Sequence, residues 1–497
     1  MSSANIFDKP ELFISIYPLV KARDRMALAR VNRTLFYTIM PDLWTSVSGL
    51  RQLLTLIPNW YGIMKWATQP IEVFNNKIDQ VDCSRFDLYA QWTKHLELCK
   101  FRMPAFKTEE LYALRRLSAR RPLIPHLLSL TCTDFRVHED VQLILPFLVP
   151  SLIRLEFSIV KAWPIYDITI TEASIMLHVL SKKCPYIRAL AICPQPDGYK
   201  PRVAHYPLMF LSQDDQPLVI PRLRDLGSFL AAIPPLTSFS CSSELVNDSC
   251  FSIMASWICL ESLEISFDSW RERALSPLPS NSFPSLRHLS LYQAEISVLN
   301  VFSRIEAITK KILSVTVFLC QDIDDGLLLH LAALSELVGQ SFNLQKLWIR
   351  AKELAQNPYI LEASELQVFQ SLPLRCLRLE GILFQGDNDD ATGSSLSIAL
   401  ALLEIFPDLT ELITPNHPLS LVDLQYLTYR KPHLNKLSLH LMNSEVLHSI
   451  APDINQLPRN RPASMHIVEI DLFGVNKYNW KGTGDFFTYS YADALMR

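Results

Sequence analysis

The sequence predicts an α/β solenoid in which short strands alternate with helices, preceded by a small all-α module of three helical pieces. Three observations lead to this fold class. An apolar triplet recurs along most of the chain, a proline stands just before many of its copies, and runs of helical periodicity separate the copies. A chain that is 49% hydrophobic over 497 residues has enough apolar side chains to bury a long, continuous repeat core.

The triplet has the spacing L-x-x-L-x-L. Its last two apolar residues are two positions apart, which places both on one face of a short strand and the residues between them on the other face. Weaker copies lie in KIDQVDCS, HLLSLTCT, LTSFSCSS, KILSVTVFL, DLTELITP and HIVEIDLFG. The clear copies are Leu152, Leu155 and Phe157; Ile187, Leu190 and Ile192; Leu260, Leu263 and Ile265; Leu286, Leu289 and Leu291; Leu344, Leu347 and Ile349; Leu374, Leu377 and Leu379; and Leu434, Leu437 and Leu439.

Helices are predicted between the strands, where apolar residues recur with a period near 3.6 in TEASIMLHVLSKK, DSCFSIMASWI, GLLLHLAALSELVGQ and SSLSIALALLEIF. Neighbouring triplets are roughly 25 to 35 residues apart, at or just above the usual period of leucine-rich repeats. The chain therefore resembles a leucine-rich-repeat solenoid, which we assign to residues 76–475. The alternative is a doubly wound α/β sheet, which the short strands and the recurring proline disfavour.

The first 50 residues predict the helical module. Pro10 and Glu11 suit a helix start, because a missing N–H costs nothing there and a carboxylate meets the positive end of the helix dipole. Asp24 is a plausible N-cap for a second helical stretch, RMALARVNRTLFYTIM, which we expect to end at Pro41. Residues 51–75 are assigned to a linker or first cap, and residues 476–497 to a C-terminal cap or tail.

The module resembles an F-box, whose family form runs roughly L-P-x-E-L-L-x-x-I-L-x-x-L, then D-L-L-x-L-A-x-V-C-R-x-F, then L-W. Joined to leucine-rich repeats, it implies the substrate receptor of an SCF-type ubiquitin ligase, in a style common among fungal proteins. The F-box would dock on a Skp-family adaptor and through it on a cullin-RING scaffold, while the repeats bind an unknown target. Matching positions are Pro10, Glu11, Leu12, Phe13, Ile16, Tyr17, Val20, Asp24, Leu28, Ala29, Val31, Arg33, Phe36, Leu43 and Trp44. The adaptor-binding candidates among them are Pro10, Leu12, Phe13, Ile16, Leu28 and Val31.

An alternative interpretation is that the same helices only cap the first repeat, whose open core a solenoid has to cover. The chain would then be a protein-binding scaffold unconnected to ubiquitin. The two interpretations differ in one observable: a cap hides its apolar residues against the repeats, whereas an F-box leaves an apolar face open.

The outward-facing residues of the central strands are the predicted target-binding surface. Trp348 stands between Lys346 and Arg350, and aromatic and arginine side chains are typical anchors of protein interfaces. Such a mildly cationic, aromatic surface suits an acidic or phosphorylated segment. The alternative is that Trp348 packs on a neighbouring strand while the cations are simply solvated. The target-binding candidates are Lys346, Trp348, Arg350, Arg378, His288 and Tyr292.

Other classes of function find little support in the sequence. A net charge of −3 gives no reason to expect nucleic acid or an anionic membrane as partner. There is no HExxH, no zinc-type Cys/His spacing, no G-x-S-x-G and no Walker-type loop, so we expect neither enzyme activity nor a cofactor. The ten cysteines include no CxxC pair, and Cys83, Cys132 and Cys241 fall in apolar rhythms. We therefore expect a protein of a reducing compartment, the cytoplasm or nucleus.

Overall fold

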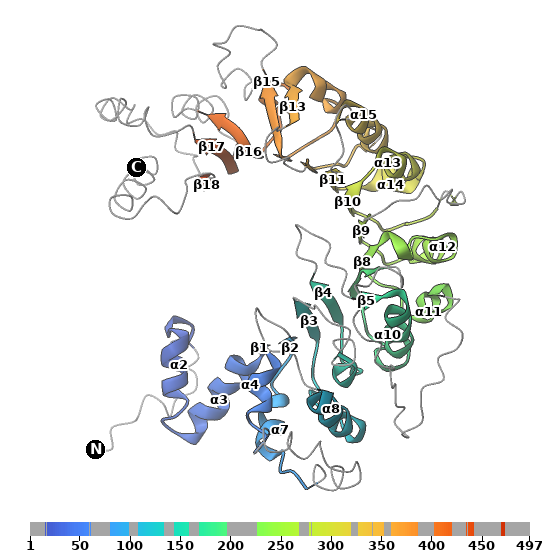
Figure 1. The fold of residues 1–497 in the computed structure, drawn as a ribbon. Coiled ribbons are helices and arrows are strands. Elements are labelled where there is room, and N and C mark those ends of the chain that lie inside the picture. Colours follow the sequence, from blue (N-terminus) through green and yellow to red (C-terminus); the bar gives the residue numbers. More distant parts are fainter. Residues whose placement is uncertain are drawn as a thin grey trace, which may run out of the picture. The chain divides into compact units, whose positions relative to one another are not determined.

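The computed structural model describes residues 15, 17–58, 60, 80–98, 108–133, 144–158, 168–195, 226–267, 278–279, 281–319, 327–339, 341–351, 359–385, 402–419, 434, 436–441 and 469–472. The chain divides into two compact units, Met1–Trp257 and Ile258–Arg497. The division falls inside what the sequence predicts as one repeat array. Each unit is described by itself (Figure 1).

Unit 1 is built on a parallel sheet whose strands follow one another in chain order, β1-β2-β3-β4-β6-β8. Figure 1 shows helices α10, α11 and α12 on one side of these strands. Its strands are β1 Ser46–Ser48, β2 His95–Glu97, β3 Ser129–Thr133, β4 Arg154–Ser158, β6 Ala189–Ile192 and β8 Ser238–Ser242, with the separate pair β5 Ile168–Thr169 and β7 Pro194–Gln195. Its helices are η2 Tyr17–Leu19, α2 Ala22–Leu28, α3 Arg33–Trp44, α4 Leu50–Leu54, α7 Ser84–Ala90, α8 Thr108–Arg120, η3 Leu145–Phe147, α10 Ile170–Lys183, α11 Leu226–Ala232, η4 Ser243–Leu245 and α12 Asp248–Ser256.

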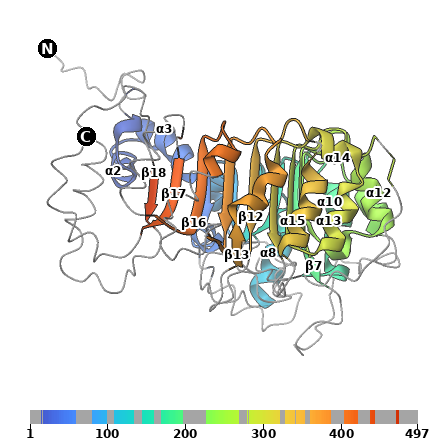
Figure 2. The ribbon, with the colours of Figure 1, turned by 90° about the horizontal axis from the view of Figure 1, so that it is seen from above.

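Unit 2 repeats this arrangement, with parallel strands in the order β9-β10-β11-β12-β14-β16-β17-β18. The last strands of this order, β16 to β18, lie side by side in Figure 2. The strands are β9 Ser262–Ser266, β10 His288–Ala294, β11 Ser314–Leu319, β12 Lys346–Arg350, β14 Cys376–Glu380, β16 Glu411–Leu419, β17 Lys436–Leu441 and β18 Glu469–Leu472, with the separate pair β13 Tyr359–Glu362 and β15 Ile382–Gln385. The helices are α13 Ile296–Ser303, α14 Glu306–Lys311, α15 Leu327–Val338 and η5 Ala363–Phe369.

Strand order within each unit confirms the predicted α/β solenoid of leucine-rich repeats. A doubly wound sheet reverses its strand order at a switch point, and the order of the described strands in each unit has no reversal. The triplets supply the core as their spacing predicts: Leu347 and Ile349 are 1% and 0% exposed, and Leu377 and Leu379 are 1% and 0% exposed. The described cysteines form no disulfide, and Cys83, Cys132 and Cys241 are buried as expected.

Successive repeats are also joined by side-chain hydroxyls at the turn before the strand. Ser285 donates to the Ile258 carbonyl at 2.6 Å, Ser341 to the Ile312 carbonyl at 3.0 Å, and Thr410 to the Arg375 carbonyl at 3.0 Å. Each of these bonds adds a side-chain link between one repeat and the next.

The predicted helices are found in three of four places, as α10, α12 and α15. Most of the fourth run, SSLSIALALLEIF, lies outside the described residues, as does the acidic segment GDNDDATG. The prediction of a strand in KIDQVDCS was wrong over residues 80–84, where the chain turns and enters α7. The strand of that repeat is β2, whose Leu96 is buried beside Val47 of β1.

Three details of the N-terminal helices were also predicted wrongly. The stretch expected as one helix breaks at residues 29–32, because the side chain of Asn32 accepts a hydrogen bond from the Leu35 N–H at 2.8 Å and caps a new helix, α3. The N-cap of α2 is Lys21 rather than Asp24, which lies in the first turn. Pro41 does not end the second helix but lies inside α3, which runs on to Trp44.

The parallel sheet begins at β1, before residue 76. The assignments of residues 1–50, 51–75, 76–475 and 476–497 to module, linker, solenoid and cap or tail stay predictions. Residues 473–497 lie outside the described part of the chain.

Candidate functional site

Helix α3 of unit 1 packs its inner face against the start of the repeats. The ring of Phe36 lies 6.3 Å from that of Tyr89 in α7, and Leu35, Ile39 and Met40 of the same helix are 2%, 0% and 8% exposed. The ring of Trp44 lies 4.5 Å from that of Tyr89 in α7. The module is therefore fixed to the solenoid by aromatic contacts.

The segment just before α3 is different, because it leaves large apolar side chains uncovered. Leu19 of η2 is 84% exposed, Met26 of α2 is 52% exposed, and Val31 in the following turn is 61% exposed. In Figure 1 α2 lies beyond α3, on the side away from β1. We call Leu19, Met26 and Val31 the exposed apolar residues of the module.

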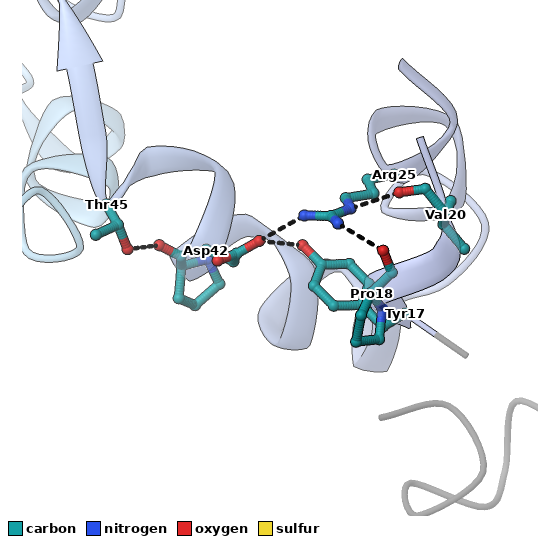
Figure 3. A network of polar contacts seen from close by, with 7 residues as sticks. Tyr17, Pro18, Val20, Arg25, Asp42 and Thr45 are labelled. Carbon is teal, nitrogen blue, oxygen red and sulfur yellow. Dashed lines mark hydrogen bonds and ion pairs between the residues drawn. The ribbon is translucent and has the colours of Figure 1, made fainter. Parts of the chain in front are cut away.

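A polar network holds this outer segment on α3 (Figure 3). Asp42 of α3 accepts hydrogen bonds from the Tyr17 hydroxyl at 2.5 Å and from Arg25 Nη1 at 3.1 Å. Arg25 also donates from Nε to the Val20 carbonyl at 2.8 Å, and its guanidinium lies 4.4 Å from the centre of the Tyr17 ring. Burial, followed by the hydrogen bond to Asp42, raises the pKa of Tyr17 to about 12, so the phenol stays protonated and donates. The network sets how η2 and α2 lie on α3.

Four of the adaptor-binding candidates, Pro10, Leu12, Phe13 and Ile16, lie outside the described residues. The other two are described: Leu28 is half-buried, and Val31 is exposed.

All six target-binding candidates lie on strands β10, β12 and β14 with side chains at outward, alternating positions of unit 2. On β12, Leu347 and Ile349 are buried, whereas Lys346 is exposed and Trp348 and Arg350 are half-buried. We call the side of β10, β11, β12 and β14 that carries these outward residues the open face. His288, the sixth candidate, is also on β10 and begins the same face.

Register brings four candidates together on the open face. Tyr292 is paired with Phe318, Phe318 with Arg350, and Trp348 with Arg378. The ring centres of Tyr292 and Phe318 are 4.5 Å apart, and those of Phe318 and Trp348 are 5.1 Å apart in an edge-to-face arrangement. Such geometries are favourable for aromatic pairs. The result is a continuous row of aromatic rings across β10, β11 and β12. We call Tyr292, Phe318 and Trp348 the aromatic floor.

Two arginines lie on this floor. The guanidinium of Arg378 is 4.1 Å from the centre of the Trp348 ring, and that of Arg350 is 5.4 Å from the centre of the Phe318 ring. Both are within the range of cation–π attraction. We call Tyr292, Phe318, Trp348, Arg350, Arg378 and Glu380 the aromatic–arginine cluster.

Glu380 joins the two arginines. Its Oε1 accepts from Arg378, and its Oε2 lies 3.4 Å from Arg350 Nε. The Glu380 side chain is 13% exposed, whereas those of Arg350 and Arg378 are 42% and 35% exposed. Arg350 and Arg378 are therefore ion-paired rather than simply solvated, and Trp348 does pack on a neighbouring strand.

Glycine is required immediately after Glu380. Gly381 has φ +73°, and a Cβ there would lie 2.1 Å from the Ala351 carbonyl oxygen. The Glu380 carbonyl accepts a hydrogen bond from the Ala351 N–H at 2.8 Å. This close approach fixes the backbone that carries Glu380 against the end of β12.

The remaining two candidates lie at the beginning of the strands, away from the aromatic floor. His288 and Lys346 share one register row, with Ser314 between them. Partial burial of the imidazole, together with the positive charges of Lys346 and Arg287, lowers the pKa of His288 against the opposing effect of Glu261. His288 is therefore less readily protonated than an ordinary histidine.

Neither Phe318 nor Glu380 is among the predicted candidates. A signal for both exists in the sequence: aligning the triplets at L-x-L places Tyr292, Phe318, Arg350 and Glu380 at one position of successive repeats. KILSVTVFL is a weak copy without leucine at the strand positions, which obscures the alignment.

Groups of histidine, cysteine or carboxylate side chains able to hold a metal ion are absent from the described residues. Of the helices that the structure describes, none has both the length and the apolar character needed to cross a bilayer.

Comparisons with known proteins find similar solved structures but do not assign the chain to a family. Neither the protein-family models nor the curated proteins include a match to the chain. Among solved structures, the chain is similar to an internalin (InlF) of Listeria monocytogenes strain 4b F2365, with 13% identity and TM-score 0.31 over 84% of this chain and 97% of that one. It is also similar to TLR13 in a complex with ssRNA13, with 15% identity and TM-score 0.33 over 70% of this chain and 39% of that one. With TM-scores of this size, the assignment of the repeat fold rests on the strands and helices described above.

Proposed function

We propose that the chain is a substrate receptor of an SCF-type cullin-RING ubiquitin ligase in the cytoplasm or nucleus. Its N-terminal helices dock on a Skp-family adaptor, and its repeats bind the target protein. The observation that carries this proposal is the uneven burial of the N-terminal helices. One side of α3 is buried, while Leu19, Met26 and Val31 are exposed. Helices that only capped the repeats would gain nothing from large apolar side chains left in water.

The energetics of docking favour a few anchors. Covering a fully exposed large apolar side chain is worth roughly 1.5–3 kcal/mol. Because Leu19, Met26 and Val31 are already partly covered, they contribute about 3–6 kcal/mol together before the cost of association is subtracted. On the adaptor side we retain Pro10, Leu12, Phe13, Ile16, Leu28 and Val31, which the F-box resemblance implies, and we add Leu19 and Met26. A receptor needs no chemistry of its own, because holding a target beside the conjugating enzyme raises its effective concentration there.

The second candidate function is a protein-binding repeat scaffold without the ligase. The contacts of Phe36 and Trp44 with Tyr89 of α7 favour it, because these two residues of α3 do cover the start of the repeats. In that case the exposed residues of the module have no adaptor to bind.

The test is capture of the full chain by a purified Skp-family adaptor. The variant Met26→Asp/Val31→Asp places two carboxylates on the exposed side chains, and we expect it to lose capture while its circular dichroism and melting temperature stay those of the wild type. Leu329→Asp is the matched control, since Leu329 is also an apolar residue 61% exposed, on α15 of unit 2. Absence of capture by the well-folded wild type, or equal loss in Leu329→Asp, would leave the scaffold as the better interpretation.

A further inference from the structure

We infer that the aromatic–arginine cluster binds an acidic peptide segment of the target, whose oxyanion replaces Glu380 as the partner of Arg350 and Arg378. The inference rests on the proposed function in one respect only, namely that the repeats hold a protein target. It specifies the chemistry of that target: a carboxylate or phosphate beside an apolar or aromatic side chain.

Charge complementarity is the first argument. Over the aromatic floor, the open face of β12 and β14 carries two cations, Arg350 and Arg378, against the single carboxylate of Glu380. The outward positions of β11, Ser314, Thr316 and Phe318, carry no charge. The surface therefore has a positive excess exactly where its aromatic floor lies. Arginine is the side chain best suited to carboxylate and phosphate, because its planar fork donates two parallel hydrogen bonds.

The second argument is that Glu380 already occupies the arrangement that a ligand would use. Each of its two carboxylate oxygens meets one arginine, Oε1 with Arg378 and Oε2 with Arg350. Both arginines remain a third or more exposed, whereas Glu380 is nearly covered. An oxyanion arriving from solvent therefore reaches the two guanidinium groups from their open side and competes with Glu380 for them.

The third argument comes from Trp348. Its indole Nε1–H is buried and has no hydrogen-bond acceptor in the structure, although a buried indole N–H usually finds one. Arg378 is the charged group that lies over this ring, at 4.1 Å. A ligand that draws Arg378 outward opens access to the indole and brings an acceptor for its N–H.

The aromatic floor requires that the acidic peptide segment also carry an apolar or aromatic residue beside its acid. Tyr292, Phe318 and Trp348 contact one another edge to face or tilted, so their positions are fixed before a ligand arrives. A preorganised surface loses little freedom on binding. An apolar or aromatic residue next to the acid would cover this floor once the arginines turn to the oxyanion.

The experiment measures fluorescence anisotropy of the full chain with three labelled octapeptides. One carries Glu-Glu beside Phe, the second has phosphoserine in place of one Glu, and the third has Gln-Gln in place of Glu-Glu. We expect the two anionic peptides to bind and the Gln-Gln peptide to bind at least tenfold more weakly. The ratio between the phosphoserine and glutamate peptides distinguishes the two sources of the oxyanion.

Two variants give opposite expectations. Arg378→Gln should weaken binding of the anionic peptides on the order of tenfold to a hundredfold, as for loss of a charge-assisted hydrogen bond. Glu380→Gln should strengthen it, because the competing carboxylate is gone. Arg304→Gln and Glu336→Gln, at exposed positions of unit 2 outside the cluster, are the matched controls and should change nothing.

Three results would overturn the inference: no saturable binding of either anionic peptide up to about 1 mM, equal binding of the Gln-Gln peptide, or a Glu380→Gln variant that weakens binding as Arg378→Gln does. The last would mean that Glu380 only orients the arginines. Adaptor capture is measured on the same preparations. If capture fails while anionic peptides bind, the ligase proposal fails and the acid-binding site stands. If capture succeeds while anionic peptides do not bind, the acid-binding site fails and the ligase proposal stands.

Discussion

The packing of α3 within the N-terminal part of unit 1 can be tested by truncating its most buried residue. Ile39 is 0% exposed, so Ile39→Ala removes three buried carbons at about 0.8 kcal/mol each, roughly 2.4 kcal/mol, and leaves a cavity. With the cavity included, the expected cost is about 3–4 kcal/mol, within the usual range for large-to-small core changes. The better helix propensity of alanine offsets at most about 0.7 kcal/mol of it.

Hydrogen–deuterium exchange of peptides from residues 33–44 measures this cost where it arises. A loss of about 3 kcal/mol in the free energy of opening should speed exchange roughly a hundredfold, since each 1.4 kcal/mol is a factor of ten. Val31→Ala is the control, because Val31 is 61% exposed and has little packing to lose. Its expected effect is about threefold or less. If Ile39→Ala changes exchange less than threefold, or Val31→Ala matches it, α3 is not anchored as described.

Three further outcomes are expected. Gly381→Ala should lower the stability of unit 2 by more than about 1 kcal/mol in a denaturant titration, because its φ is +73° and the new Cβ would meet the Ala351 carbonyl oxygen; an unchanged midpoint would contradict this. Burial, followed by the Glu411 carboxylate, raises the pKa of the Cys376 thiol to about 11, so iodoacetamide labelling followed by mass spectrometry should speed up about tenfold per pH unit between pH 7 and 9. Glu411→Gln should label faster at pH 8, and a rate independent of pH would count against the thiolate mechanism. Thr169→Ala should cost about 1–2 kcal/mol in thermal unfolding, because it removes one half of the capping box of α10, whereas the exposed Thr38→Ala should cost close to nothing.

The repeat fold was predictable because each strand can be recognised from the residues of the strand alone. In KLWIR and CLRLE the alternation of apolar and polar residues alone separates the buried side from the open side, and the structure follows it residue by residue. The helices between strands were predictable for the same reason, at their own period. Neither pattern depends on anything distant in the chain.

The N-terminal helices were harder because competing local signals are nearly balanced. The apolar rhythm of residues 25–40 continues through the break at residues 29–32, but the Asn32 side chain offers the Leu35 N–H a partner and starts a new helix there. Pro41 was expected to stop α3. The packing of Trp44 on Tyr89, one turn beyond the proline, rewards a helix that continues, and Tyr89 is too far along the chain for local patterns to reveal.

The aromatic–arginine cluster was only half predictable. Trp348, Arg350 and Arg378 stand out by residue type, but what they do depends on register between strands about thirty residues apart. That register pairs Arg350 with Glu380 and thereby turns three separate charges into one bridged group. A charge count along the sequence treats the arginines as free cations, whereas in the structure their availability is set by a carboxylate on the next repeat.

The cap and the adaptor-docking interpretations of the N-terminal helices need not exclude each other physically. Helix α3 contacts the repeats through Phe36 and Trp44, whose ring centres lie 6.3 Å and 4.5 Å from that of Tyr89, while Asp42 holds Tyr17 and Arg25. The aromatic contacts anchor the module to the repeats, and the polar network fixes the segment that carries Leu19, Met26 and Val31. Fixing that segment lowers the conformational entropy that a partner would otherwise have to remove on binding. A rigid attachment to the repeats therefore strengthens docking, and Asp42→Asn should weaken adaptor capture even though Asp42 need not touch the adaptor.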